Sequence, residues 1–207
     1  MAVPSTEPRR RISKEARRAK LIAAAETVFG EVGYSDATME LVAARGGVTR
    51  SLLYEHFASL DDLYLECVRS ARAELDARML EAMVSNQGHP EQQLRAGITA
   101  YFQFVSEHAA GWEVLAGTAA RPAGPIAERV AELRFQSAER IAVLFMQVVP
   151  HIDPDEARAG AHIVSGGGEQ LARWWRRNAQ VPLETVVELM MTAIWRGLRE
   201  RLEEETA

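Results

Sequence analysis

Five side chains between positions 49 and 56 could recognise nucleic acid. An arginine can form two hydrogen bonds with the edge of a guanine, and short hydroxyl side chains can bond to a base or a phosphate. A tyrosine hydroxyl suits a phosphate oxygen. The five residues are Thr49, Arg50, Ser51, Tyr54 and His56. Any one of them alone is typical of ordinary helix surface, and it is the ordered set that predicts a DNA-reading face.

The apolar residues among them predict how that face is turned outward. Leu53 and Phe57 are four residues apart, so they share one face of a helix, and Val48 precedes them near the same face. A short helix over 49–57 can therefore bury these three side chains while it exposes the polar ones.

A second short helix is expected just before this one, over 39–45, with Thr38 as its N-cap. Gly46 and Gly47 follow it and supply a turn. Two short helices joined by a glycine-containing turn form the outline of a helix-turn-helix. The motif is expected over about 38–57.

Helical periodicity continues through the rest of the chain, and the alternating patterns typical of strands are nearly absent. Ser59 followed by Asp62 is a capping box that opens a long helix. The predicted fold class is all-α. Nine helices are expected, over 14–31, 39–45, 49–57, 60–83, 90–109, 111–118, 124–149, 155–178 and 182–204.

Charge is distributed unevenly along the chain. The net charge is −5, yet the first 20 residues carry seven basic and two acidic side chains. A basic head on an acidic body is expected where only one end meets a polyanion. Arg9, Arg10 and Arg11 are therefore expected either to contact DNA or to belong to a solvated tail.

Composition excludes several other classes of protein. Cys67 is the single cysteine, which excludes a disulfide framework and a zinc site of several thiolates, and it is expected to be a buried thiol. No di-iron, Walker-loop, nucleophile-elbow or His-Glu-x-x-His pattern occurs. There is also no apolar run of about 18 residues. We therefore expect a cytoplasmic protein that is not an enzyme, with no cofactor, no metal and no membrane contact.

The segment over about 15–65 resembles the tetracycline-repressor (TetR/AcrR) family of bacterial regulators. The residues that carry the resemblance are Phe29, Gly33, Tyr34, Thr38, Gly47, Val48, Thr49, Leu53, Tyr54, His56, Phe57, Ser59, Asp61 and Leu63. The resemblance implies that Thr49 caps the recognition helix and that Arg50 and Ser51 face bases or phosphates. It also implies backbone contacts by Tyr54 and His56, and a phosphate contact by Thr38 at a helix N-terminus.

Two positions depart from the family pattern. The family usually has a lysine after the Ser59 position, where it meets a phosphate, and Leu60 stands there instead. That contact is in doubt, and the arginine-rich arm could compensate for it. Leu52 occupies a position that is often small in the family, and it either contacts a thymine methyl group or packs inward.

The resemblance further implies a dimer built from the last two helices, as a four-helix bundle across a two-fold axis. Gly166, Gly167 and Gly168 each cost a helix roughly 1 kcal/mol relative to alanine, a cost that is tolerable where backbones approach closely. A kinked or bulged helix is the alternative explanation. The expected interface residues are Gly160, Ser165, Gly167, Val187, Met191, Ile194 and Trp195.

An effector pocket is implied among the helices over 90–149. Tyr101, Phe104, His108 and Trp112 fall on nearly one face close to a helix junction, and they are the expected ligand contacts. Aromatic residues at helical spacing also fit an ordinary core, so this alternative stays open. Nothing in these residues identifies the ligand.

Together these expectations divide the chain into a basic flexible arm over 1–13, a helix-turn-helix domain over 14–60, and an effector-binding and dimerisation domain over 61–207. A break at 86–90 is another place where a boundary could fall. The expected function is a ligand-responsive homodimeric transcription regulator, a repressor that a small molecule releases from a palindromic double-stranded DNA operator. A transcriptional activator is the alternative, and the acidic body disfavours an effector-independent architectural DNA-binding protein.

Overall fold

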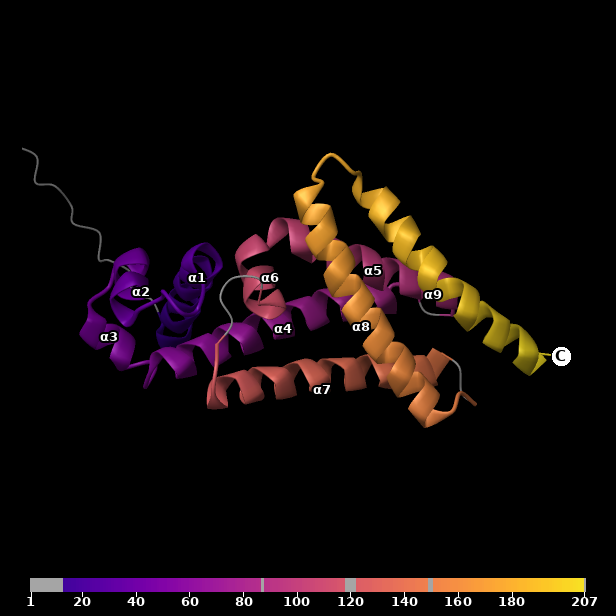
Figure 1. The fold of residues 1–207 in the computed structure, drawn as a ribbon, viewed down its shortest axis with the longest axis horizontal. Helices are drawn as coiled ribbons and strands as arrows, with labels where there is room; N and C mark the ends of the chain where they lie inside the picture. The colour runs from indigo at the N-terminus through magenta and orange to yellow at the C-terminus, as the bar shows by residue number, and fades with distance from the viewer. Residues whose placement is uncertain (1–12, 87, 118–121, 149–150, 207) are drawn as a thin grey trace, which may run out of the picture.

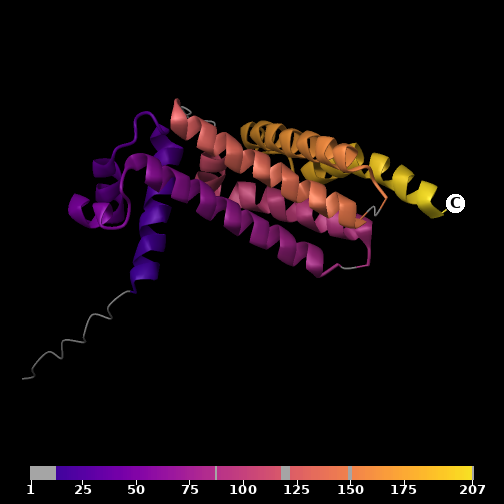
Figure 2. The ribbon, with the colours of Figure 1, turned by 90° about the horizontal axis from the view of Figure 1, so that it is seen from below.

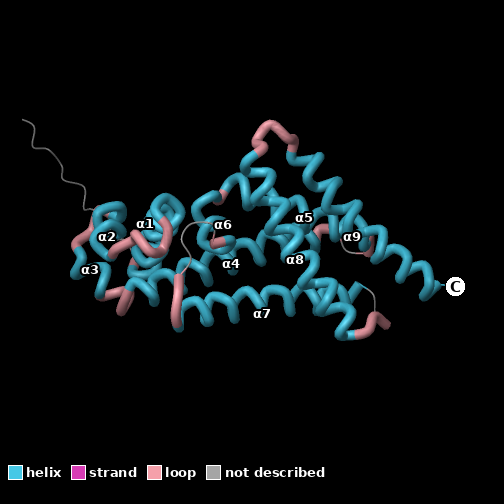
Figure 3. The backbone as a smooth tube through the Cα atoms, in the orientation of Figure 1, coloured by secondary structure: helices cyan, strands magenta, loops and turns pink. Residues whose placement is uncertain are grey.

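Helices form almost the whole chain in the computed structural model, which describes residues 13–86, 88–117, 122–148 and 151–206. The expected arm with Arg9, Arg10 and Arg11 lies outside the described residues. Within them there are nine helices and no strand, which confirms the all-α prediction (Figure 3).

The first three helices gather at one end of the elongated molecule (Figure 1). They are α1 (Lys14–Val32), α2 (Met39–Gly46) and α3 (Arg50–Tyr54). A side-chain oxygen caps each N-terminus, from Ser13, Thr38 and Thr49 in turn. Because these caps satisfy backbone N–H groups that have no partner inside a helix, they fix where each helix begins.

Six further helices form the body. They are α4 (Leu60–Val84), α5 (Pro90–Glu107), α6 (Ala109–Ala116), α7 (Pro125–Val148), α8 (Pro154–Arg177) and α9 (Leu183–Thr206). Helix α4 begins beside α3 and runs into the body, where it packs along α5 (Figure 2). The break at 86–90 thus falls between two helices that pack along each other, and a boundary there stays a prediction.

The predicted helix bounds agree with the observed ones to within two residues, except at the end of the helix expected over 49–57. That helix was expected to reach residue 57, but α3 ends at Tyr54. The Leu53 carbonyl accepts hydrogen bonds from the backbone N–H groups of both His56 and Phe57, at 3.1 and 3.0 Å, which closes the helix in a tight turn. Ser59, in extended conformation, then caps α4.

One hydrophobic core joins the two ends of the described chain. It runs without interruption from Leu21 in α1 through Phe57 and Leu63 to Met191 in α9. Small residues allow α1 and α6 to approach closely, since a β-carbon at Gly30 would lie 3.4 Å from the Cα atom of Ala110. The division at residue 60 stays a prediction, and the helices on its two sides pack against each other.

Candidate functional site

The turn between α2 and α3 is fixed by backbone chemistry. Gly47 has φ +63°, a left-handed conformation that glycine adopts without steric cost. Its N–H group bonds back to the end of α2. The Thr49 hydroxyl then accepts the N–H of Leu52 at 3.2 Å. This pair of residues sets the angle at which α3 leaves α2.

Arg50 lies at the start of α3 and is exposed to solvent. Its guanidinium forms an ion pair with Glu40 of α2 and donates a hydrogen bond to the Tyr54 hydroxyl at 3.3 Å. It also lies over the Tyr54 ring, 5.3 Å from the centroid. The hydrogen bond to Tyr54 and the charge of Glu40 raise the pKa of Arg50 above its ordinary value. The sequence analysis did not single out Glu40, because its role depends on how α2 and α3 cross.

The other expected DNA contacts surround this pair. Thr38, Thr49 and Ser51 are exposed, whereas Leu52 and His56 are half-buried. His56 lies beyond the end of α3, in the turn that leads to α4, with its ring beside Phe57. The expected face is therefore a cluster formed by two helix N-termini and the turn after α3. DNA contact by each of these residues stays a prediction.

Behind this face, α3 is anchored by fully buried Leu53 and Phe57. The Arg18 guanidinium lies 4.9 Å from the centroid of the Phe57 ring and pairs with Glu66 of α4. Leu60, which stands where the family usually has a lysine, packs against the core as the first residue of α4. The side chain thus serves packing in place of a phosphate contact.

The loop after α1 is tied to α4 through tyrosines. The Tyr34 hydroxyl donates a hydrogen bond to Asp61, and burial together with that carboxylate raises the pKa of Tyr34. The rings of Phe29 and Tyr64 meet edge to face at 4.9 Å. The position of the first three helices is therefore fixed to the start of α4.

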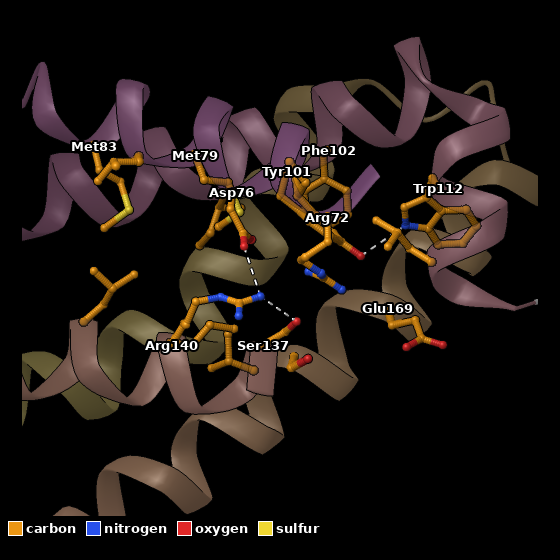
Figure 4. A pocket seen from close by; sticks show the side chains of 18 of the residues that line it. Arg72, Asp76, Met79, Met83, Tyr101, Phe102, Trp112, Ser137, Arg140 and Glu169 are labelled. Carbon is orange, nitrogen blue, oxygen red and sulfur yellow. Dashed lines mark hydrogen bonds and ion pairs between the residues drawn. The ribbon is translucent and has the colours of Figure 1, made fainter. Parts of the chain in front are cut away.

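A cavity of about 290 Å³ lies inside the body, among α4, α5, α6, α7 and α8 (Figure 4). Its wall is mostly apolar, with a few charged and hydroxyl side chains. The residues that line it are Arg72, Leu75, Asp76, Met79, Leu80, Met83, Ile98, Tyr101, Phe102, Trp112, Leu115, Ala116, Ser137, Arg140, Ile141, Leu144, Val164, Ser165, Glu169 and Met190.

Two of the four expected ligand contacts line this cavity. Tyr101 and Trp112 do so, and the Trp112 indole donates a hydrogen bond to the Tyr101 hydroxyl at 3.4 Å. Burial raises the pKa of Tyr101 to about 12. Phe104 and His108 do not line it, and this part of the prediction is corrected. Phe104 is fully buried on another side of α5, toward Gly111, and its ring stacks on that of His108.

The sequence analysis missed the charged part of the cavity wall. An Arg140 nitrogen lies 3.1 Å from a carboxylate oxygen of Asp76, and it donates to the Ser137 hydroxyl at 3.1 Å. These residues come from α4 and α7, which are about 60 positions apart in the chain. No local spacing signals their approach.

The expected dimer interface needs correction at several positions. Val187 and Met191 are buried in the core of their own chain, because α9 packs on α5 through this face. Gly160 lies against the Phe145 ring, and Ser165 lines the cavity. These four residues therefore face inward.

The rest of the expected interface lies nearer the surface. Gly167 is exposed and a β-carbon there would meet nothing within 4 Å, while Ile194 and Trp195 are half-buried. Helix α8 is continuous through its three glycines, without the alternative kink. Ile163 and Trp174 on α8 and Leu189 on α9 are exposed apolar residues that the prediction did not include.

Histidine, acidic and cysteine side chains also occur elsewhere among the described residues. No three His, Cys, Asp or Glu side chains there are placed to hold a metal ion. None of the helices among them is both long and apolar enough to cross a membrane. Cys67 is fully buried, as expected, and burial raises the pKa of its thiol.

The crossing of α2 and α3 around a left-handed glycine defines a helix-turn-helix protein, here with an all-helical body. The chain matches the family model "Bacterial regulatory proteins, tetR family" over residues 21–67. It also matches the model "Tetracyclin repressor-like, C-terminal domain" over residues 90–197. The chain belongs to the TetR family of bacterial regulatory proteins.

Individual relatives agree with this assignment. The transcriptional activator FasR of Mycolicibacterium smegmatis is 32% identical over 105 residues, which cover 51% of this chain and 48% of FasR. The chain thus spans about half the length of the curated relatives that it matches.

Solved structures share the fold. A TetR-like regulator from Rhodococcus sp. RHA1 superposes with a TM-score of 0.72 and 23% identity, over 91% of this chain and 99% of that one. AibR, solved in complex with isovaleryl coenzyme A and operator DNA, superposes with a TM-score of 0.69 and 16% identity, over 86% and 97%.

Proposed function

We propose that this protein is a ligand-responsive transcription regulator. A homodimer binds a palindromic operator through α2 and α3, and a small molecule in the body cavity changes its affinity for that DNA. The protein acts as a repressor, because the small molecule releases it from the operator and so allows transcription. The observation that carries the proposal is the exposed first turn of α3, where the solvent-exposed Arg50 can reach a major groove while Leu53 and Phe57 hold the helix from behind.

The electrostatics of α3 fit a nucleic-acid partner. Arg50 already binds a carboxylate and a hydroxyl within its own chain, so a guanine edge or a phosphate can replace Glu40 as the acceptor. Thr38 and Thr49 stand at helix N-termini, where backbone N–H groups favour anions such as phosphate. The basic arm over 1–13 adds contacts that are independent of DNA sequence.

A dimer follows from the geometry of DNA. Two recognition helices must lie about 34–36 Å apart, or a multiple of this, to enter successive major grooves. We place the two-fold interface on the exposed face of α8 and α9. Ile163, Gly167 and Trp174 are exposed on α8, at spacings of four and seven residues that put them on one face of the helix. The two helices with their copies would form a four-helix bundle.

Helix α4 supports a coupling between the cavity and the DNA site. Its first turn packs behind α3, and its later residues Arg72, Asp76 and Met79 line the cavity. A ligand that favours one tilt of α4 changes the spacing of the two α3 helices. A hundredfold loss of DNA affinity requires about 2.7 kcal/mol of coupling free energy. By reciprocity, operator DNA must weaken ligand binding by the same factor.

The first experiment selects bound DNA from a randomised double-stranded library and measures affinity by fluorescence anisotropy. Arg50→Ala is expected to cost about 1–3 kcal/mol and to relax specificity at one base pair in each half-site. Arg95→Ala, on α5 far from α3, is the matched control. Enrichment of no sequence, or equal losses in the two variants, would refute the assignment of α3.

Deletion of Arg9, Arg10 and Arg11 separates positioning from readout. The deletion is expected to weaken binding evenly across DNA sequences and to flatten the salt dependence. A change in base preference on this deletion, without one on Arg50→Ala, would contradict the proposed division between arm and helix.

Activation is the second candidate function, because the relative FasR is named as a transcriptional activator. An activator binds its operator in the same way. Transcription in vitro from a template that contains the selected site distinguishes the two, since a repressor lowers the transcript level and an activator raises it.

A further inference from the structure

A second cavity adjoins the first one in the body. It measures about 300 Å³ and lies between α4 and α7, on the side toward the start of α4. The two cavities share Arg72, Asp76, Leu115 and Arg140 in their walls. These four side chains therefore stand at the junction of the two cavities.

The second cavity is basic. Its lining includes four arginines, Arg69, Arg72, Arg134 and Arg140, and a single carboxylate, that of Asp76. Arg69 pairs with Glu66 at 2.6 Å, and Arg134 donates to the Leu115 carbonyl at 2.7 Å. Arg140 forms an ion pair with Asp76 at 3.1 Å. Arginines therefore outnumber carboxylates four to one in the lining of this cavity.

Arg72 is the least satisfied of these side chains. It is half-buried between the two cavities, and it makes no hydrogen bond or ion pair with the residues that the structure describes. Burial lowers its pKa, Asp76 opposes this, and the neighbouring Arg140 and Arg134 add to it. A buried guanidinium stays charged and is costly without a partner, so its position between two cavities suits a bound anion.

The far end of the first cavity has the opposite chemistry. Leu75, Met79, Met83, Ile98 and Leu144 line it from α4, α5 and α7. Methionine side chains are flexible and fit their shape to irregular apolar partners. At about 290 Å³ this cavity stands at the lower end of the ~300–1,000 Å³ that ligand pockets span, which suits a chain of short or medium length.

We propose that the effector is an amphipathic anion, whose apolar acyl chain fills the first cavity while its carboxylate or phosphate headgroup binds Arg72 and Arg140 at the junction with the second. This rests on the proposed function only in treating the cavity as the effector site. The chemistry fits a free fatty acid and an acyl thioester of coenzyme A alike. Both combine an aliphatic chain with an anionic end.

Isothermal titration calorimetry of the full chain, without DNA, tests the proposal. The probes are decanoate, decanoyl-coenzyme A and uncharged decanol, at pH 8 and below their micelle concentrations. We expect at least one of the two anions to bind tenfold or more tightly than decanol, a difference of about 1.4 kcal/mol. The anion that binds more tightly identifies the source of the headgroup.

Variants connect that preference to the proposed residues. Arg72→Met keeps an unbranched apolar stem and removes the charge, and it is expected to lower anion affinity at least tenfold while leaving decanol affinity unchanged. Arg140→Met is the second variant in case the first does not fold, as judged by circular dichroism. Arg95→Met, at a half-buried position of α5 that pairs with Glu188 and lines neither cavity, is the matched control and should bind like the wild type.

Equal affinity for decanol and both anions, or no binding of any probe, would overturn the proposal. So would an Arg72→Met or Arg140→Met protein that keeps the full anion preference. Because no DNA is present, these outcomes are independent of operator binding. An anion that binds as expected but leaves DNA affinity unchanged would refute the regulatory coupling and support the ligand assignment.

Discussion

Glu26 makes stability depend on pH at the contact between α1 and the body. Its carboxylate lies among α1, α4 and α6, and a β-carbon at Gly111 would be 3.8 Å from its Oε2 atom. Burial, followed by the negative charge of Glu74, raises the pKa of Glu26 from an ordinary 4.5 to about 7. Arg78 and His108 bind Glu74 from its other side, at 2.9 and 3.4 Å, so they do not neutralise Glu26 directly.

The sign and size of the effect follow from these values. Between pH 4.5 and about 7 the folded protein holds a proton on Glu26 that the unfolded chain has lost, so the free energy of unfolding falls as pH rises. The stabilising contribution is complete below pH 4.5 and is lost above pH 7. A rise of this size corresponds to at most about 3 kcal/mol.

Glu26→Gln tests this reasoning, because glutamine resembles the protonated acid at every pH. Urea unfolding at a fixed protein concentration, at pH 5 and pH 8, gives the free energy of unfolding for the wild type and the variant. We expect the variant to be more stable than the wild type at pH 8, by up to about 3 kcal/mol, and the difference to shrink toward pH 5. Glu15→Gln, exposed on the same helix, is the control and should show no such trend.

An equal pH dependence in the wild type and Glu26→Gln would show that the carboxylate is ionised in the folded protein. The reasoning from burial would then be wrong. A variant less stable than the wild type at both pH values would show instead that the ionised form has a stabilising partner.

Three further variants test other parts of the structure. Gly47→Ala forces a β-carbon into the left-handed turn and should cost about 1 kcal/mol in urea unfolding, since nothing lies within 4 Å to add a clash. Leu53→Ala removes a fully buried side chain behind α3 and should cost about 2–5 kcal/mol and lower DNA affinity as well. Gly167→Arg points into open space in the single chain, so it should leave the helical fold intact by circular dichroism and yield monomers by light scattering, while Gln103→Arg on α5 stays dimeric. A fully dimeric Gly167→Arg protein would refute the placement of the interface.

Local signals in the sequence predicted the elements well. Caps such as Thr38 and Ser59 act within three residues, and the Gly47 turn depends on one residue type, so the positions of α2, α3 and α4 follow from short segments. The polar face of α3 was predictable for the same reason. Its apolar partners Leu53 and Phe57 lie in the same short segment.

Long-range contacts were beyond the same signals. Helical periodicity predicts that Val187 and Met191 share a face. It does not indicate whether that face packs against α5 or against a second chain. Likewise, nothing in the sequence distinguishes Arg72, Asp76 and Arg140 from ordinary polar positions on helices. Only the packing of α4 against α7 brings them to one cavity. Phe104 was misplaced because residues three apart on a helix differ by about 60° in direction, enough to enter different layers.

The close approach of α1 to α6 limits how this protein can be re-engineered. A β-carbon at Gly30 would already touch Ala110 of α6, and one at Gly111 of α6 would touch Ala71 of α4, so side chains larger than alanine there would push these helices apart. The first three helices are thus not a free cassette, and a chimera that joins them to the body of a relative must also bring a matching surface on α6. DNA specificity is exchanged between relatives more simply by substitutions on α3, because its outward side chains take no part in the contact between α1 and α6.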